Sequence, residues 1–304
     1  MIPLSVPAFE RYRDIIPDYE AFRESLNCPP ATFLRVNTRK VDVESFRSEM
    51  TKYGNRLEPV QGIEEAFRLD GIKSPGTMLE YFLGHYQVQG LTSMLPPRIL
   101  GPQPGELILD LCAAPGGKTT YLAQLMGNRG LIVANDVKAE RIGILRSHLD
   151  RLGIVTVAIT RYPGEAFPGG MTFQRILVDP PCSGEGTYWL GSKPPVSKDS
   201  NAAGRLRKLQ RSILRRAFDL LRPGGTLVYS TCTYAPEENE AVVNGVLAEG
   251  QAELLPITLP LPHSQGLISW EEMDFSSEML KTIRVYPHQV NSWGFFIAHL
   301  RKRV

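Results

Sequence analysis

The chain contains few cysteines and no long hydrophobic run. Its 304 residues include four cysteines (Cys28, Cys112, Cys182 and Cys232), and none belongs to a CxxC pair or to a Cys/His set with metal-ligand spacing. This argues against a disulfide framework and against a zinc site. The longest apolar segments are short and interrupted by Gly, Pro or charged residues, which argues against a membrane span. We therefore expect a cytoplasmic protein with reduced thiols, no metal and no membrane contact.

Net charge is also nearly absent. The chain has 34 basic and 32 acidic residues, and a balance of +2 does not by itself argue for a nucleic-acid partner. A solvated helix face is the commoner reason for a run of basic residues, but a run without carboxylates lacks i,i+4 ion pairs and projects a positive field. Such a field suits a phosphate backbone. One run of this kind contains six basic residues and no acidic one: Arg205, Arg207, Lys208, Arg211, Arg215 and Arg216.

The order of segments divides the chain into two expected domains, 1–95 and 96–304. The first has helix-like segments and one extended stretch, which predicts a small α+β domain, and prolines from Pro96 to Pro104 mark the junction. In the second, strands alternate with helices, which is typical of a mainly parallel sheet with a closing antiparallel pair. The expected helices are 8–26, 42–53, 117–127, 138–152, 204–222 and 236–248, and the expected strands are 33–37, 106–111, 131–135, 154–159, 174–179, 225–231, 281–286 and 294–300.

A loop of small residues follows the first strand of the second domain and opens a helix. It reads Cys112-Ala113-Ala114-Pro115-Gly116-Gly117-Lys118-Thr119. Small residues let backbone amides approach a ligand, and the helix N-terminus adds partial positive charge. Asp136 ends the second strand, where a carboxylate receives ribose hydroxyls in nucleotide-binding folds. The loop therefore predicts a site for a nucleoside cofactor.

Two other ligands were weighed for this loop. Gly117-Lys118-Thr119 resembles the end of a P-loop, but that motif needs glycine at the position of Cys112, so an NTPase is rejected. The loop does not spell GxGxxG, which disfavours a nicotinamide cofactor. A turn without a ligand is the remaining alternative.

Two further loops each present a cysteine after a strand. In Asp179-Pro180-Pro181-Cys182 the proline pair makes the backbone stiff, so Asp179 and Cys182 are expected at fixed positions. An aromatic residue in place of Cys182 would indicate amino-group methylation, and its absence argues against that chemistry. Cys232 lies at a strand-to-helix turn, where amide dipoles lower the pKa of a thiol. A free cysteine is more often an inert core residue, but two at the rim of neighbouring strands favour a nucleophilic role.

Three segments, 110–119, 179–187 and 230–234, resemble the motifs of the RsmB/NOP/Sun family of RNA cytosine-5 methyltransferases, and 294–296 is similar to that family's last strand. The resemblance implies a Rossmann-like methyltransferase fold behind an N-terminal domain that contacts RNA, with rRNA or tRNA as the substrate. It also implies that S-adenosylmethionine is the cofactor. The residues implied to bind it are Cys112, Ala113, Ala114, Pro115, Gly116, Gly117, Lys118, Asp136, Arg141 and Asp179.

The resemblance also assigns catalytic roles. Cys232 is implied as the nucleophile that adds to C6 of cytosine, which activates C5 toward a methyl sulfonium, and Cys182 as the cysteine that aids product release. Asp179 would hydrogen-bond the base edge and offset charge that develops on the ring. Lys118 is expected close to the same base.

One position departs from the family pattern. Pro163 occupies the place of an acid that receives the adenine amino group, so either Glu165 substitutes for that acid or shape alone holds adenine. Two rival functions stay open. One is an RNA-binding homologue with weak or lost catalysis, and the other is a DNA cytosine-5 methyltransferase. The DNA enzymes use the cysteine of a Pro-Cys loop as nucleophile and need no Thr-Cys-Thr loop, so the presence of both cysteines favours RNA.

Overall fold

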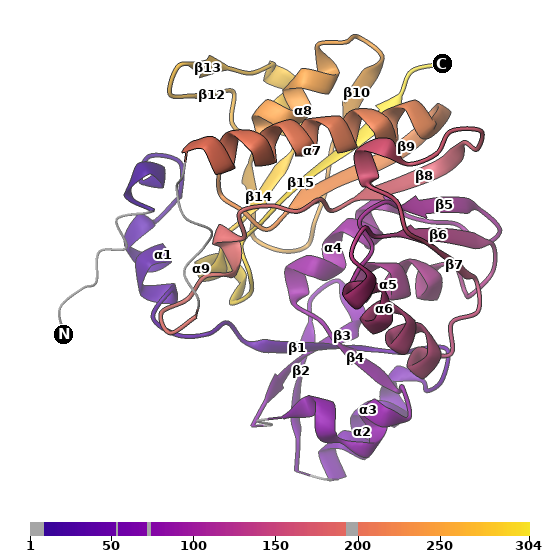
Figure 1. Cartoon of the computed structure of the whole chain (residues 1–304). Coiled ribbons are helices and arrows are strands. Elements are labelled where there is room, and N and C mark those ends of the chain that lie inside the picture. The colour runs from indigo at the N-terminus through magenta and orange to yellow at the C-terminus, as the bar shows by residue number, and fades with distance from the viewer. Residues whose placement is uncertain (1–8, 53, 72–73, 193–199) are drawn as a thin grey trace.

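Two sheets organise the computed structural model, which describes residues 9–52, 54–71, 74–192 and 200–304 (Figure 1). The larger has the strand order β11-β14-β15-β9-β8-β5-β6-β7, and β10 pairs with β15. Strands β5 to β9 are parallel neighbours, whereas β15 runs antiparallel beside β9 and pairs with β14. The predicted α/β fold with a closing antiparallel pair is therefore confirmed. The strands are β5 (Leu107–Asp110), β6 (Leu131–Asn135), β7 (Val157–Thr160), β8 (Phe173–Val178), β9 (Leu221–Thr231), β10 (Ala252–Leu255), β11 (Ser264–Gln265), β14 (Ile283–Val285) and β15 (Phe295–Lys302).

Alternating apolar residues along the central strands build a core on each face of this sheet. Leu109 and Leu227 pack with α7 and α8, whereas their neighbours Ile108 and Val228 pack with α4 and α5. Side chains alternate between faces along a strand, so apolar residues at consecutive positions are expected where helices cover both faces. The helices are α4 (Leu91–Leu100), α5 (Gly117–Leu125), α6 (Ala139–Leu152), α7 (Ser200–Leu220) and α8 (Glu240–Leu247).

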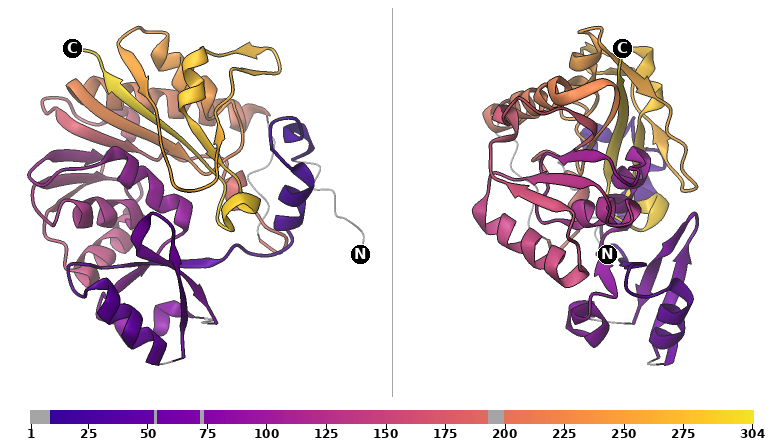
Figure 2. Two further views of the ribbon diagram at one scale, coloured as in Figure 1. Left: turned by 180° about the vertical axis from the view of Figure 1, so that it is seen from behind. Right: turned by 90° about the vertical axis from the view of Figure 1, so that its right-hand side faces the viewer.

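The smaller sheet, with the order β2-β3-β1-β4, lies at the end of the molecule opposite the C-terminus (Figure 2). Its strands are antiparallel, and α2 packs Phe46 and Met50 against it. Of the four strands in this sheet, the sequence predicted only the one at 33–37. The edge strand β2 escaped prediction because Glu58 and Pro59 interrupt its apolar pattern. The elements are β1 (Thr32–Val36), α2 (Val43–Lys52), β2 (Arg56–Val60), β3 (Ile63–Asp70), α3 (Leu79–Phe82) and β4 (Tyr86–Val88).

The segment before β1 packs on the large sheet, not on the small one. It contains a short 3₁₀ turn, η1 (Glu10–Tyr12), and α1 (Tyr19–Ser25), which lies beside α9 (Pro287–Val290) (Figure 1). The single helix predicted over 8–26 is wrong within the described residues, because Asp18 adopts a left-handed conformation (φ 47°) and caps α1 with its side chain. Aromatic residues of this segment cluster with rings from the second half of the chain.

Helix α4 contains two prolines, contrary to the prediction for this region. Pro96 and Pro97 were predicted to mark a domain junction, yet α4 continues through them. Pro97 cannot donate to the carbonyl of Ser93, and the Gln89 side-chain amide donates to that oxygen instead (3.1 Å). The division into 1–95 and 96–304 stays a prediction, and α4 spans its boundary.

The start of α8 was also predicted wrongly. Pro236 was taken as the first residue of the helix, but α8 begins at Glu240. Asn239 holds the preceding turn in a non-helical conformation, because its side chain bonds the Thr231 hydroxyl (2.5 Å) and the Thr233 carbonyl (3.0 Å). The other elements predicted in the second half agree with the structure to within a few residues.

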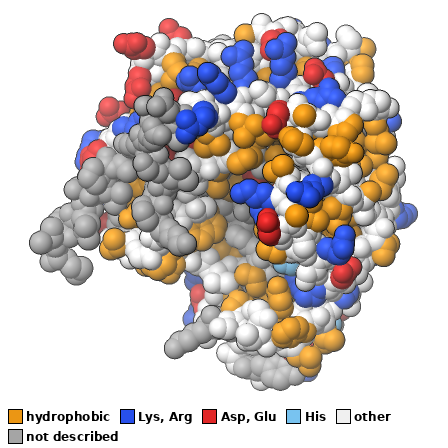
Figure 3. Space-filling view, in the orientation of Figure 1, with side chains coloured by type: hydrophobic (Ala, Val, Ile, Leu, Met, Phe, Trp, Pro, Cys, Tyr) orange, Lys and Arg blue, Asp and Glu red, His pale blue; other side chains and the backbone are white. Residues whose placement is uncertain are grey.

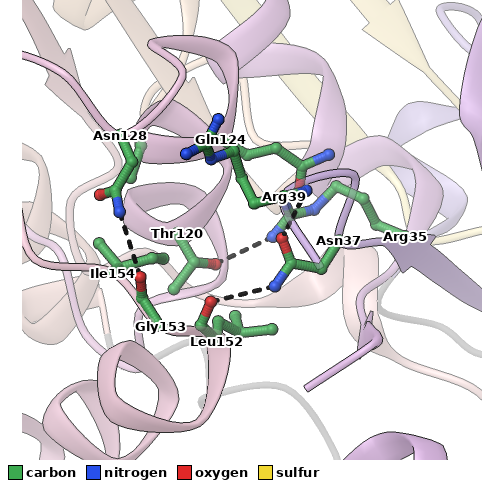
Figure 4. Close-up of a pocket in the computed structure, with 10 residues that line it drawn as sticks. Arg35, Asn37, Arg39, Thr120, Gln124, Asn128, Leu152, Gly153 and Ile154 are labelled. Carbon is green, nitrogen blue, oxygen red and sulfur yellow. Dashed lines mark hydrogen bonds between the residues drawn. The ribbon is translucent and has the colours of Figure 1, made fainter. Parts of the chain in front are cut away.

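A buried arginine joins the two sheets. Arg35 on β1 is 2% exposed, and its guanidinium lies over the Tyr121 ring of α5, 4.3 Å from the ring centroid. It donates to Gln89 (3.1 Å) and Thr120 (3.0 Å) and also to Gln124, and several of these groups line the small pocket in Figure 4. Burial lowers the pKa of Arg35 to about 10. Among the described residues no carboxylate pairs with it, so neutral oxygens alone satisfy this cation.

Removal of that cation is expected to weaken the junction. Arg35→Met leaves the side-chain oxygens of Gln89 and Gln124 without their donor, so the free energy of unfolding should fall by about 3 kcal/mol. Urea denaturation measures this loss. Arg39→Met is the matched control, since Arg39 lines the same pocket but is exposed, and it should cost less than roughly 0.5 kcal/mol. Equal losses in the two variants would contradict this role for Arg35.

Candidate active site

Three loops meet at one edge of the large sheet. Strands β9, β8 and β5 are consecutive parallel neighbours, so their carboxyl ends lie side by side. The loops that follow them contain Cys232, Asp179 with Cys182, and the small-residue segment 112–118. Ligands of open α/β sheets bind at this edge.

The two predicted cysteines lie in contact. The register of β8 and β9 pairs Val178 with Tyr229, and the loops beyond this pair bring Cys182 and Cys232 together. Their Sγ atoms are 3.1 Å apart, and both residues are partly exposed. A thiol pair at an accessible sheet edge is not an inert part of the core.

The thiols differ in proton affinity. The hydrogen bond between the two thiols lowers the pKa of Cys232, an effect that burial and Asp179 oppose and that the Lys118 ammonium supports. The pKa of Cys182 is raised well above its usual value by the same contact and by burial. The sequence predicted a lowered pKa from amide dipoles at a helix start. The main cause is instead the second thiol. Of the two thiols, Cys232 is therefore the one that ionises more readily.

An ion pair lies next to the thiols. The Nζ of Lys118 donates to Asp179 Oδ2 (2.7 Å), and the Ser230 hydroxyl donates to Asp179 Oδ1 (2.9 Å). Lys118 also lies over the Phe295 ring, 5.2 Å from the centroid. Burial alone would lower the pKa of Lys118, but Asp179 more than compensates and raises it. The structure therefore brings together the four predicted catalytic side chains, and Lys118 stays protonated at neutral pH.

Two glycines hold the Cys232 loop against its neighbours. Gly186 donates to the carbonyl of Cys232 (2.9 Å) and accepts from the amide of Gly294 (2.8 Å). A Cβ at Gly186 would lie 2.4 Å from the Gly294 oxygen, and one at Gly294 would lie 2.3 Å from a ring carbon of Tyr234. Only residues without a side chain allow these backbones to approach so closely.

The predicted cofactor residues also gather at this edge. Asp136 is 3% exposed, and its carboxylate accepts from the amides of Ala114 (3.2 Å) and Lys138 (2.9 Å), with Arg141 Nη1 3.3 Å away. Gly116 precedes α5 with φ 105°, where a Cβ would lie 2.7 Å from Leu145. Small side chains, a helix N-terminus and a fixed carboxylate suit a nucleoside.

Cys112 is not part of the thiol pair. Burial, together with the carboxylates of Asp110, Asp179 and Asp136, raises the pKa of its thiol well above the usual value. The Cys112 thiol therefore stays protonated, and the residue contributes a small side chain to the segment 112–118.

The edge next to Asp136 lacks a buried acid at the predicted position. Pro163 and Glu165 are both exposed, and Glu165 lies in the 3₁₀ turn η3 (Gly164–Ala166). Asn135 fixes this loop, because its side chain exchanges two hydrogen bonds with the Tyr162 backbone (both 2.9 Å). The ring of Tyr162 is also exposed in this loop.

Sequence reasoning missed Glu238, a carboxylate that contacts the Cys182 loop. Glu238 accepts from the Ser183 amide (3.0 Å) and from Gln210 of α7 (2.7 Å), and Gln210 also donates to the Pro181 carbonyl (2.9 Å). Glu238 had been assigned to the first turn of a helix. The sequence offered one clue to this contact. Gln210 is an uncharged polar residue among the basic residues of α7, and its side chain is buried.

Comparison with known proteins identifies the family. Residues 97–301 match the model of the 16S rRNA methyltransferase RsmB/F family, and residues 9–74 match the ferredoxin-like domain of RsmF/B-like methyltransferases. The chain therefore belongs to the RsmB/F family of RNA methyltransferases. The family resemblance and the enzyme class predicted from sequence are confirmed.

Curated relatives carry several substrate names. The tRNA (cytosine(49)-C(5))-methyltransferase of Pyrococcus abyssi is 38% identical, with 96% of this chain and 94% of the relative covered. The 28S rRNA (cytosine(4447)-C(5))-methyltransferase of Homo sapiens is 39% identical over 92% of this chain and 35% of its own length. The ribosomal RNA small subunit methyltransferase F of Erwinia tasmaniensis is 36% identical, with 97% and 63% covered. This chain thus spans less than two thirds of the last two.

Solved structures agree with the fold. A methyltransferase homologue from Pyrococcus horikoshii superimposes with a TM-score of 0.86 at 34% identity, over 98% of this chain and 95% of the other. NSun6 from the same organism, solved with SFG, gives 0.81 at 24% identity over 96% of both chains and supports the fold alone. Within the described residues, no helix is long and apolar enough to cross a membrane, and no group of three or more His, Cys, Asp or Glu side chains is arranged to hold a metal.

Replacement of Cys182 tests the origin of the lowered pKa. Cys182→Ala removes the S–H donor, so the pKa of Cys232 should rise and its alkylation by iodoacetamide near neutral pH should slow. Mass spectrometry of the Cys232 peptide over a range of pH measures this shift. Cys28→Ala is the control, because Cys28 is exposed and outside the thiol pair, and it should leave the profile unchanged. An unaltered profile in Cys182→Ala would contradict the assignment.

Proposed function

We propose that this protein methylates C5 of cytosine in structured RNA, either rRNA or tRNA, through a transient bond between Cys232 and C6. The observation that carries the proposal is the thiol pair, 3.1 Å apart and with opposite pKa shifts, beside the Asp179–Lys118 ion pair. A reactive thiolate next to a proton-bearing thiol is suited to an addition that must later be reversed.

Each step of this chemistry is assigned to a particular residue. The Cys232 thiolate adds to C6 and pushes electron density onto C5, which then accepts the methyl group. S-adenosylmethionine, when bound, supplies that group as a sulfonium. After a water molecule takes the C5 proton, the C5–H electron pair forms the C5–C6 double bond, the C6–S bond breaks and Cys232 leaves as a thiolate. Cys182 stabilises the leaving sulfur with the same S–H hydrogen bond that it donates in the absence of RNA.

Asp179 selects and orients the base. Ser230 and Lys118 each hold one of its carboxylate oxygens, and the side chain keeps 27% of its surface exposed. Both oxygens retain lone pairs that can accept from the amino group of cytosine, a donor that uracil lacks. Lys118 stays charged beside Asp179 and offsets negative charge near Cys232. The target base must leave any stack to reach this edge.

S-adenosylmethionine fits the edge beyond Lys118. The segment 112–118 presents backbone and small side chains to the nucleoside, and Asp136 would receive the ribose hydroxyls. Arg141 now contacts the Asp136 carboxylate and the Ala114 carbonyl, and so joins the cofactor loop to α6. With Pro163 in the usual place of an acid, we propose that adenine is held mainly by shape.

The basic residues of α7 form the proposed RNA surface. In the view of Figure 3, Lys and Arg side chains gather along this helix, above a hollow in the surface. Two of the six basic residues have a carboxylate partner outside the run: Arg215 lies 3.6 Å from Glu249, and Arg216 lies 4.0 Å from Asp219. Among the six, the exposed residues that form no ion pair within the described residues are Arg205, Arg207, Lys208 and Arg211.

Cysteine variants test the covalent step. Cys232→Ala should abolish transfer of labelled methyl groups to RNA, because C6 then has no nucleophile. Cys182→Ala should accumulate a protein–RNA adduct on denaturing gels, because release is slowed. Full activity of Cys232→Ala would discard the mechanism. RNA binding without transfer by the wild-type protein would favour the non-catalytic alternative, and transfer to DNA alone would favour the DNA enzyme.

Salt dependence tests the RNA surface. The double variant Arg207→Gln/Arg211→Gln should weaken RNA binding and reduce the slope of log K against log salt by roughly 1.5, because two phosphate contacts are lost. Arg146→Gln/Arg222→Gln, on exposed positions outside α7, should leave both values unchanged. Wild-type binding that does not respond to salt, or equal effects of the two double variants, would count against this surface.

A further inference from the structure

The N-terminal segment reaches the catalytic loops through Tyr12. This residue is fully buried among Phe9, Tyr234 and Trp270, on the large-sheet side of the molecule. Its hydroxyl leaves this apolar cluster and donates to Glu185 Oε2 (2.9 Å). Burial and the Glu185 carboxylate raise the pKa of Tyr12 strongly, so the hydroxyl remains a donor. Packing alone does not require a hydroxyl at this position.

Glu185 connects this hydroxyl to both cysteine loops. The Thr233 hydroxyl donates to the same Oε2 atom (3.1 Å), and the Ser183 and Thr233 hydroxyls are 2.7 Å apart. The proton of Thr233 is directed to the carboxylate, so Ser183 is the donor in the second bond. Ser183 follows Cys182 and Thr233 follows Cys232. One carboxylate therefore orders the residues next to both thiols, and Tyr12 fixes that carboxylate from the opposite side.

The backbone adds a second connection. Gly186, the residue after Glu185, donates to the carbonyl of Cys232 (2.9 Å). A shift of the Glu185 backbone would therefore also move the backbone of Cys232. Burial raises the pKa of Glu185, and hydrogen bonds from Tyr12 and Thr233 oppose that rise. Loss of the Tyr12 donor leaves a buried carboxylate less well satisfied and free to reorient.

We propose that Tyr12 is a positioning residue of the methyl-transfer reaction, which sets the approach of Cys182 to Cys232 through Glu185. The inference rests on the proposed function for its effect on turnover. Its effect on the thiols themselves does not depend on the RNA substrate. A segment far from the cysteines in the chain thus completes the active site.

The test compares two variants that each lose one tyrosine hydroxyl where the segment before β1 packs on the rest of the chain. Tyr12→Phe removes the donor to Glu185. Tyr286→Phe removes a different hydroxyl, which bonds the Ile15 carbonyl (3.2 Å) and so fastens the same segment but has no bond to Glu185, Ser183 or Thr233. Tyr12→Phe should lower kcat about tenfold, which corresponds to about 1.4 kcal/mol. KM for RNA and Kd for S-adenosylmethionine should stay unchanged. Tyr286→Phe should leave kcat within twofold of the wild type.

Conservative replacement of the acceptor supplies a second comparison. Glu185→Gln keeps an amide oxygen that accepts from Tyr12 and Thr233, so it should retain more activity than Glu185→Ala. In the absence of RNA, Tyr12→Phe should also change the pH profile of Cys232 alkylation, whereas Tyr286→Phe should not. This readout survives if the wild-type protein fails to methylate RNA, so failure of the proposed function and failure of this inference are distinguishable. An unchanged alkylation profile in Tyr12→Phe, or equal losses in both tyrosine variants, would overturn the proposal.

Discussion

The parallel pairing of β8 with β9 places two thiols on one edge of the sheet, and the chemistry of this chain depends on that placement. Side-by-side parallel strands end at the same edge, so the cysteines that follow them meet although 49 residues separate them in the chain. Their 3.1 Å contact makes the two thiols unequal. In the proposed function, the thiol that shares its proton aids release and the other thiol attacks, so a single hydrogen bond divides the two roles.

The surrounding structure keeps this contact in register. Lys118, at the start of α5, pairs with Asp179, so Cys232 does not lie beside an uncompensated carboxylate. Gln210 and Glu238 support the Cys182 loop from below, while Gly186 and Gly294 bring the Cys232 loop against β15. Preorganisation of this kind matters because an addition to C6 requires the sulfur at a defined place. The segment before β1 contributes to the same preorganisation, although strands β1 to β4 and helix α2, which follow it, form a separate layer.

Much of this site was predictable because strand ends are easy to recognise. Continuous apolar runs identified β5, β6, β8 and β9, and the rule that ligands bind at carboxyl ends then predicted which loops converge. The pairing of Lys118 with Asp179 could not be predicted, because it depends on the side-chain geometry between α5 and β8. Gln210 lies within a basic run, and only the packing of α7 shows that it points inward. Pro97 was misread because the Gln89 amide compensates for its missing donor, a tertiary effect that local propensity does not report.

The central claim is that the sulfur of Cys232 bonds to C6 during turnover. An RNA substrate that carries 5-fluorocytosine at the target position tests it most directly, because fluorine cannot leave as a proton does and the methylated adduct persists. Peptide mass spectrometry should find one methylated nucleotide attached to the peptide that contains Cys232. Attachment at Cys182, or methyl transfer to normal RNA with no adduct on the fluorinated one, would contradict the account.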